Sequence, residues 1–133
     1  MTPADGISAS LRRAYRMTRY EAAGVTVRIG VRSAAFDNLL RHHRCRAAVF
    51  ISADNPRSKR MPPAWNRRML TRLRETARRR SVLPARGTWQ AWQEAHLLVL
   101  GDPRPALRLA RMFRQNAVVI VRLHQGPRII LAV

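Results

Sequence analysis

The chain has few of the residues that mark several large classes of protein. Its 133 residues include one cysteine, Cys45, which excludes an internal disulfide and favours a reducing, cytoplasmic setting. The cysteine and the histidines do not have the spacing of a zinc site, so we expect no metal and no cofactor. No apolar run approaches the roughly 20 residues of a membrane-spanning helix. We therefore expect a soluble protein that is neither exported nor inserted into a membrane.

Acidic residues are also scarce. Seven acids stand against 26 basic residues, which gives a net charge of +19, and every basic residue except Lys59 is arginine. The field of such a chain attracts polyanions, which include RNA, DNA and anionic membrane surfaces. Adsorption to lipid is the weakest of these, because the basic helices bury their apolar faces and lack a second anchor. A merely solvated basic surface remains open, but the charge favours RNA, DNA or a nucleoprotein as partner.

The sequence carries no recognisable catalytic signature. Cys45 lies among His and Arg residues that could lower the pKa of its thiol, yet neighbours in sequence do not establish a Cys–His pair. Paired acids, as used for acid–base catalysis, are absent from the sequence pattern. Aromatic residues make up only 6% of the chain, so we expect Trp65, Trp89, Trp92 and the tyrosines to pack first and to stack on bases only second. The sequence leaves enzymatic activity open and favours a non-enzymatic role.

Apolar periodicity predicts one α+β (or α/β) domain over residues 1–133, with residues 1–9 as a flexible N-terminal tail. Helices are expected after Ser8 or Ser10, after the cap Ser33, from Pro62-Pro63 and from Asp102-Pro103. Strands are expected at residues 24–30, 47–52, 93–100, 117–121 and 128–131, and a loop at residues 80–88. The prediction is a mixed β-sheet of about four to five strands packed with three to four helices.

Two of the expected helices carry arginines along one face. The side opposite Trp65, Met69 and Leu73 presents Arg67, Arg68, Arg74, Arg78 and Arg79. The later helix presents Arg104, Arg108 and Arg111, and the loop before the first of these helices adds Arg57, Lys59 and Arg60. We expect these residues to contact the phosphates of RNA or DNA with little base specificity. A charged helix face is also commonly just a solvated one, and that interpretation stays open.

A crowded polar loop, residues 54–66, joins a buried strand to the helix at Pro62-Pro63. Asp54, Asn55, Ser58 and Asn66 occupy the place where ligands collect at strand ends, and the helix start could hold a phosphate or carboxylate. The alternative is structural: Asn55-Pro56 is a good turn initiator, and Asn66 could reach back to fix the loop.

Glu94 and Gln115 complete the candidate polar site. Glu94 shares a predicted strand face with Trp92 and His96, where a carboxyl could have a raised pKa and act as a base, or could be an ordinary ion-pair partner of an arginine. Gln115 follows the last helix, where its amide could reach a ligand or close the helix. The alternative to polyanion binding is therefore a small-ligand-binding or enzymatic domain that uses Asp54, Asn55, Ser58, Asn66, Glu94 and Gln115.

Four motifs occur together along the chain. They are Leu11-Arg-Arg-Ala-Tyr-Arg-Met-Thr-Arg-Tyr20, Phe50-Ile-Ser-Ala-Asp-Asn-Pro-Arg-Ser58 with Asn66 eleven residues after Asn55, Trp92-Gln-Glu94, and Phe113-Arg-Gln-Asn-Ala117. In this combination the chain, from about Leu11 to Val133, resembles the uncharacterised bacterial family catalogued as domain of unknown function 3293. Ser52, Asp54, Trp65 and Arg114 depart from that family's pattern. The resemblance implies a single-domain bacterial protein and no particular activity.

Overall fold

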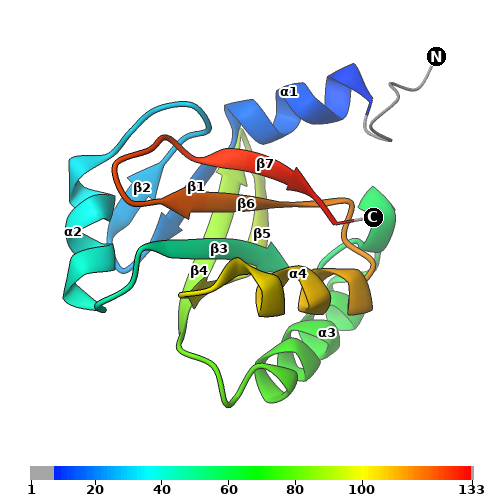
Figure 1. The fold of residues 1–133 in the computed structure, drawn as a ribbon. Helices are drawn as coiled ribbons and strands as arrows, with labels where there is room; N and C mark the ends of the chain where they lie inside the picture. The colour runs from blue at the N-terminus through cyan, green and yellow to red at the C-terminus, as the bar shows by residue number, and fades with distance from the viewer. Residues whose placement is uncertain (1–7, 133) are drawn as a thin grey trace.

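The computed structural model describes residues 8–132, which form an α+β structure around one β-sheet (Figure 1). The helices are α1 (Ala9–Met17), α2 (Ala34–His42), α3 (Pro63–Thr76) and α4 (Pro103–Met112), with a short 3₁₀ helix η1 (Pro56–Ser58). The strands are β1 (Arg19–Ala22), β2 (Val25–Val27), β3 (Ala47–Ser52), β4 (Val82–Trp89), β5 (Trp92–Leu100), β6 (Ala117–Arg122) and β7 (Arg128–Leu131). Among the described helices, none is long and apolar enough to span a membrane.

The seven strands lie in the order β2-β1-β4-β5-β3-β6-β7, and all neighbouring pairs are antiparallel. The sheet is strongly curled, so that β3, β6 and β7 run across β1 and β4 (Figure 1). The curl brings the loop after β2 against the β6–β7 turn, where Gly30 N–H donates to Pro127 O at 2.9 Å. Gly126 is required there, because a Cβ at this position would lie 2.8 Å from the Gly30 carbonyl carbon.

Two features of the predicted sheet are wrong: the four to five strands are an undercount, and the sheet is not mixed. The prediction from the sequence did not include β1 or β4. Pro84 and Gly87 led to the prediction of a loop where β4 lies. β1 ends opposite Ala85, so Pro84 has no strand on that side and its missing N–H breaks no bond to β1. The connection through α4 makes no parallel pair, because β3 lies between β5 and β6 and is antiparallel to both.

The helix starts were predicted well, because each has a local signal, either a side-chain cap or a proline in the first turn. The side chains of Ser8, Ser33 and Asp102 accept a first-turn backbone N–H of α1, α2 and α4 at 3.0 to 3.1 Å. Pro63 opens α3. The proposed tail, residues 1–9, lies largely outside the described residues, but its last residue, Ala9, already belongs to α1.

The core lies on both faces of the sheet, and β3 is buried at every position as expected for a central strand. On one face Val49 and Ile51 pack with Leu73 of α3 and Ala110 of α4. On the other face Phe50 packs with Phe36 and Leu40 of α2, with Tyr15 of α1 at the margin. α3 and α4, whose arginines were predicted to contact phosphates, therefore share one side of the sheet.

Candidate functional site

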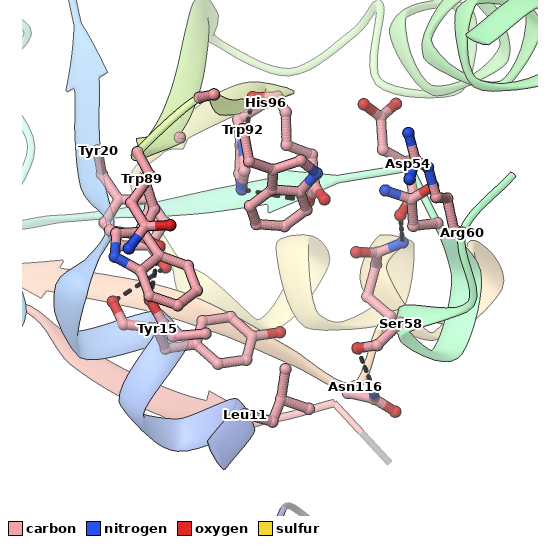
Figure 2. Close-up of a pocket in the computed structure, with 18 residues that line it drawn as sticks. Leu11, Tyr15, Tyr20, Asp54, Ser58, Arg60, Trp89, Trp92, His96 and Asn116 are labelled. Atoms are coloured by element: carbon pink, nitrogen blue, oxygen red, sulfur yellow. Dashed lines mark hydrogen bonds and ion pairs between the residues drawn. The ribbon is translucent and has the colours of Figure 1, made fainter. Parts of the chain in front are cut away.

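A pocket of about 600 Å³ lies between α1, the β4–β5 hairpin and the loop that follows β3. Tyr15 and Trp89 form an aromatic side, and Ser58 and Asn116 stand across from them (Figure 2). Of the six residues predicted for a small-ligand site, five line this pocket, namely Asp54, Asn55, Ser58, Glu94 and Gln115. The sixth, Asn66, lies in the wall of an adjoining hollow that shares Asp54, Asn55 and Glu94 with it.

Strand register brings the acids together. Ser52 at the end of β3 pairs with His96 of β5, so Asp54, two residues beyond, comes opposite Glu94. Paired residues of antiparallel strands point to the same face of a sheet. The two acids therefore line one pocket, and the charge of Glu94 acts on Asp54, although 39 residues separate them in the sequence. The sequence pattern indicated no paired acids, and the structure corrects this.

Gly87 makes room for the histidine beside these acids. It pairs with Glu94 on one side and with Tyr20 on the other. A Cβ at Gly87 would lie 3.1 Å from Cε1 of His96 and 3.2 Å from Cγ2 of Thr18, closer than ordinary van der Waals contact. A side chain at position 87 would therefore crowd the His96 ring and Thr18.

Asp54 is held firmly to the edge of β5. Ala95 N–H donates to its Oδ2 at 3.3 Å, and its own N–H donates to Ser52 Oγ at 3.0 Å. Ser52 Oγ in turn donates to Ala95 O at 2.9 Å, and Gln115 Nε2 donates to Asp54 O at 3.0 Å. These bonds position the Asp54 carboxyl group before any ligand arrives.

Asn55 and Asn66 interlock behind the pocket. Asn55 adopts the left-handed region, with φ of 47°, a conformation that asparagine tolerates well. Its N–H donates to Asn66 Oδ1, and Asn66 Nδ2 donates to Asn55 Oδ1, both at 3.1 Å. Met61 N–H donates to the same Asn55 Oδ1 at 2.9 Å. Asn66 thus fixes the loop, which is the structural alternative that the sequence left open.

Burial perturbs both acids. The Glu94 side chain is 13% exposed. Burial raises its pKa to about 7, although contacts with the side chains of Ser52 and Asn55 partly oppose the shift. Burial and the nearby Glu94 charge raise the pKa of Asp54 to about 6. Each of the two groups therefore holds a proton more readily than an exposed carboxyl group does.

His96 is neutral and presents an acceptor. Its side chain is 10% exposed, and burial lowers its pKa. Nδ1 lies 3.1 Å from Glu94 O, and a carbonyl oxygen only accepts, so Nδ1 carries the proton of the neutral ring. Nε2 is left with its lone pair and makes no hydrogen bond within residues 8–132, since Glu94 Oε1 is 3.9 Å away.

The interpretation of Glu94 as an arginine's ion-pair partner is wrong. In the described part of the chain, no arginine or lysine forms an ion pair with Glu94 or Asp54. Other acids in the chain do find arginines: Arg86 pairs with Glu21, Arg32 with Asp37, and Arg104 with Asp102.

The predicted phosphate-binding residues divide into several groups. Arg60 lines the pocket, whereas Arg57 and Lys59 are exposed in the same loop. Arg67, Arg68 and Arg74 are exposed on α3. The prediction that Arg78 and Arg79 lie on this helix is wrong, because α3 ends at Thr76 and its capping turn begins at Ala77.

The arginines of α4 are partly engaged by the protein itself. Arg104 binds the Asp102 carboxylate through Nε and Nη2, with the shorter distance 2.7 Å. Arg111 Nε donates to Ala132 O at 3.2 Å. Arg108 is exposed. The α4 stripe is therefore less available to a partner than that of α3.

The sequence did not place the aromatic side of the pocket. Tyr15, Trp89 and Trp92 could be singled out as aromatic residues, but nothing local in the sequence brings α1 to the hairpin. A signal did exist for the hairpin itself: Trp89 pairs with Trp92 across the two residues Gln90-Ala91, and Gln90 has φ of 54°. Because residues 80–88 were predicted to form a loop, the first strand of this hairpin was not recognised.

A family model described as "Protein of unknown function (DUF3293)" matches residues 51–118. The chain belongs to this family. The matched segment runs from β3 to β6 and contains the two acids, His96, both tryptophans of the hairpin and Gln115. The resemblance to this family expected from the sequence is thereby confirmed, over residues 51–118 of the longer stretch from about Leu11 to Val133. No curated protein and no solved structure matches the chain significantly.

Within residues 8–132, no group of three or more His, Cys, Asp or Glu side chains is placed to hold a metal ion. Cys45 is a half-buried thiol that does not line the pocket, and burial raises its pKa. The chemistry that this DUF3293 protein can offer in the pocket is that of two carboxyl groups, one neutral imidazole and an aromatic wall.

Proposed function

We propose that the pocket binds a small ligand and that Glu94 is its proton-exchanging group. The observation that carries this proposal is the group of Glu94, Asp54 and His96 at the base of a pocket of about 600 Å³, without an arginine or lysine in an ion pair with either acid among residues 8–132. Burying a carboxyl group without a cation costs free energy. Hydrogen-bond donors on a ligand would offset that cost.

The surrounding groups suit Glu94 to proton exchange. The titratable or charged groups around it are Asp54 from the loop after β3, His96 from its own strand, Tyr15 and Tyr20 from α1 and β1, and Arg60 at the rim. Burial raises the pKa of Tyr15 to about 12, so its hydroxyl stays neutral. A carboxyl group with a pKa near 7 is well matched to taking or giving a proton at neutral pH.

The proposal can be tested by two-dimensional ¹H–¹⁵N NMR with a fragment set of amines, heteroaromatic bases, carboxylic acids and phosphates. We expect at least one class to shift the indole N–H signals of Trp89 and Trp92. Glu94→Gln should abolish those shifts, whereas Glu75→Gln, on the exposed surface of α3, should retain them. The proposal fails if no fragment reaches the pocket signals, or if Glu94→Gln leaves the binding unchanged.

Polyanion binding is a second proposal, supported by a different surface. Arg67, Arg68 and Arg74 are exposed on α3, and their side chains form no ion pair within the described residues. Their charge adds to a chain whose net charge is +19. Such a face supports phosphate contacts whose strength depends steeply on salt.

A further inference from the structure

Around Glu94 the pocket offers a ligand mainly hydrogen-bond acceptors, whereas its donors, the Tyr15 hydroxyl, the two indole N–H groups and the Arg60 guanidinium, belong to the aromatic side and the rim. The carboxylates of Glu94 and Asp54 accept, and so does Nε2 of neutral His96. Gln115 uses Nε2 to donate to two carbonyl oxygens, those of Asp54 at 3.0 Å and Phe113 at 3.3 Å, which fixes the orientation of its amide. Its remaining polar atom is Oε1, also an acceptor. A ligand that fits this set must supply N–H or O–H donors.

The wall above these acceptors is aromatic. Trp92 is 48% exposed, a high value for a tryptophan, and it pairs with Trp89 at the tip of the hairpin. Tyr15 approaches from α1 on the same side (Figure 2). Exposed indole rings provide faces on which a planar ring stacks. The shape and chemistry of the wall therefore select a flat ring that carries its donors on one edge.

The net charge of the chain further restricts the chemical class of the ligand. A free amine would satisfy the acceptors, but the field of a chain with net charge +19 repels a free cation. A neutral ring with an amino group avoids that penalty. Arg60 lines the same pocket opposite the aromatic side, and Lys59 is exposed next to it, so an anionic group attached to the ring would have a partner at the rim (Figure 2).

We propose that the pocket takes the base of a nucleotide bearing an exocyclic amino group: cytosine, adenine or guanine. The inference rests on the proposed function of the pocket. The amino group donates to Glu94, the ring lies against Trp92, and the phosphate meets Arg60. A pocket of about 600 Å³ is of the size that holds such a ligand. The nucleotide is either free or an unpaired residue of a single strand, since both present the same base edge.

The test uses two matched pairs in isothermal titration calorimetry. CMP and UMP differ at C4, where CMP has an amino group and UMP a carbonyl oxygen, and at N3, which carries a proton only in UMP; AMP and IMP differ in the same way at C6 and N1. We expect the amino-bearing member of at least one pair to bind about tenfold more tightly or better, because the other member turns a carbonyl oxygen toward a carboxylate. Glu94→Gln should remove the difference within the pair, since an amide can both donate and accept.

Two tryptophan variants separate stacking from folding. Trp92→Ala should weaken both members of a pair by similar factors of about ten, because stacking is indifferent to the amino group. Trp65→Phe should change neither, since Trp65 lies in a separate groove between α3 and the end of α4. Retained binding of nucleotides by Trp92→Ala would contradict the placement of the base.

The remaining outcomes are distinguishable. Equal affinity within both pairs, or no binding of any nucleotide, overturns the nucleotide inference. If fragments of another class then still shift Trp89 and Trp92, the pocket remains a ligand site, and if none does, both proposals fail. A base preference shown by the mononucleotides identifies a free nucleotide as the ligand. The same preference shown only between oligocytidylate and oligouridylate, or between oligoadenylate and oligoinosinate, identifies a single strand.

Discussion

Glu94 makes the stability of the protein depend on pH in a direction opposite to that of most acids. Its folded-state pKa is about 7, whereas an unfolded Glu titrates near 4.3. Between these values the folded state binds more protons than the unfolded state, so stability falls as pH rises through this window. The stabilising contribution of the protonated form is complete below about pH 4 and is lost by about pH 7.

Replacing Glu94 by Gln should remove this dependence. The amide keeps the shape and can still interact with Ser52 and Asn55 but never ionises. We expect Glu94→Gln to raise the free energy of unfolding at pH 8 by ~2 to 3 kcal/mol relative to the native chain, and by much less at pH 5. Urea unfolding at both pH values measures this. Parallel changes at pH 5 and pH 8 would show that Glu94 does not carry the effect, and Glu75→Gln serves as the exposed control.

Gly87 tests the packing under His96. Because its Cβ would lie 3.1 Å from the His96 ring, Gly87→Val must displace the ring or the strand. We expect a loss of about 1 to 3 kcal/mol in the free energy of unfolding and a shift of the His96 imidazole NMR signals. Thr88→Val, on the opposite face of β4, should leave those signals in place. Unmoved His96 signals in Gly87→Val would contradict the geometry.

At this scale the sequence singled out five polar residues that the structure brings to one pocket, but not their arrangement. Asp54 and Glu94 were each recognisable as uncommon acids next to strands. Their pairing depends on the β3–β5 register, in which Ser52 meets His96, and no local pattern encodes that register. Gly87 was read as a loop residue, because a glycine that serves close packing looks the same in sequence as one that serves a turn.

At the scale of elements, the loop after β3 depends on one asparagine pair. Removing the Asn66 side chain leaves the Asn55 N–H without its acceptor in a partly buried position. We expect Asn66→Ala to lower the free energy of unfolding by about 1 to 3 kcal/mol. Hydrogen exchange should quicken at the Asn55 and Met61 amides while the amides of β6 keep their protection. Unchanged exchange at Asn55 would mean that other contacts fix the loop.

The elements that the sequence predicted are those with local signals. The capped helices were found through Ser33 and Asp102, and β3 through its continuous apolar run. β1 was missed because it has only four residues, Arg19–Ala22, before the turn at Ala23-Gly24, too few to show an alternating pattern. β1 pairs with β4, which aligns Tyr20 with Gly87. This is a long-range contact that no local sequence pattern predicts.

At the scale of the whole molecule, the net charge of the chain is positive, whereas the pocket contains two acidic side chains. The chain as a whole carries +19, yet two of its seven acids meet at the base of the pocket. The basic surface would attract the phosphates of a polyanion. The hydrogen-bond acceptors in the pocket would instead bind N–H donors on its bases. The two proposals are therefore compatible: the α3 face would attract a nucleic acid or nucleotide, and the pocket would discriminate among bases.

The contribution of the α3 face can be separated from that of net charge by matched triple variants. One variant replaces Arg67, Arg68 and Arg74 by Gln. The other replaces three exposed arginines around α2 by Gln, namely Arg28, Arg44 and Arg46. Both variants lose three charges, so a diffuse field would be weakened equally in each. Fluorescence anisotropy of nuclease-treated protein with labelled single-stranded RNA, duplex RNA and duplex DNA, at several salt concentrations, measures the affinities.

We expect the α3 variant to lower the slope of log K against log salt by about two for single strands, since each phosphate contact contributes about 0.7. The α2 variant should lower it by less than one unit. Equal losses in the two variants would assign binding to net charge rather than to a face of the molecule. Weak binding of all three probes at near-physiological salt would overturn polyanion binding and leave the pocket as the functional surface, because its acceptors and aromatic wall do not depend on the arginines of α3.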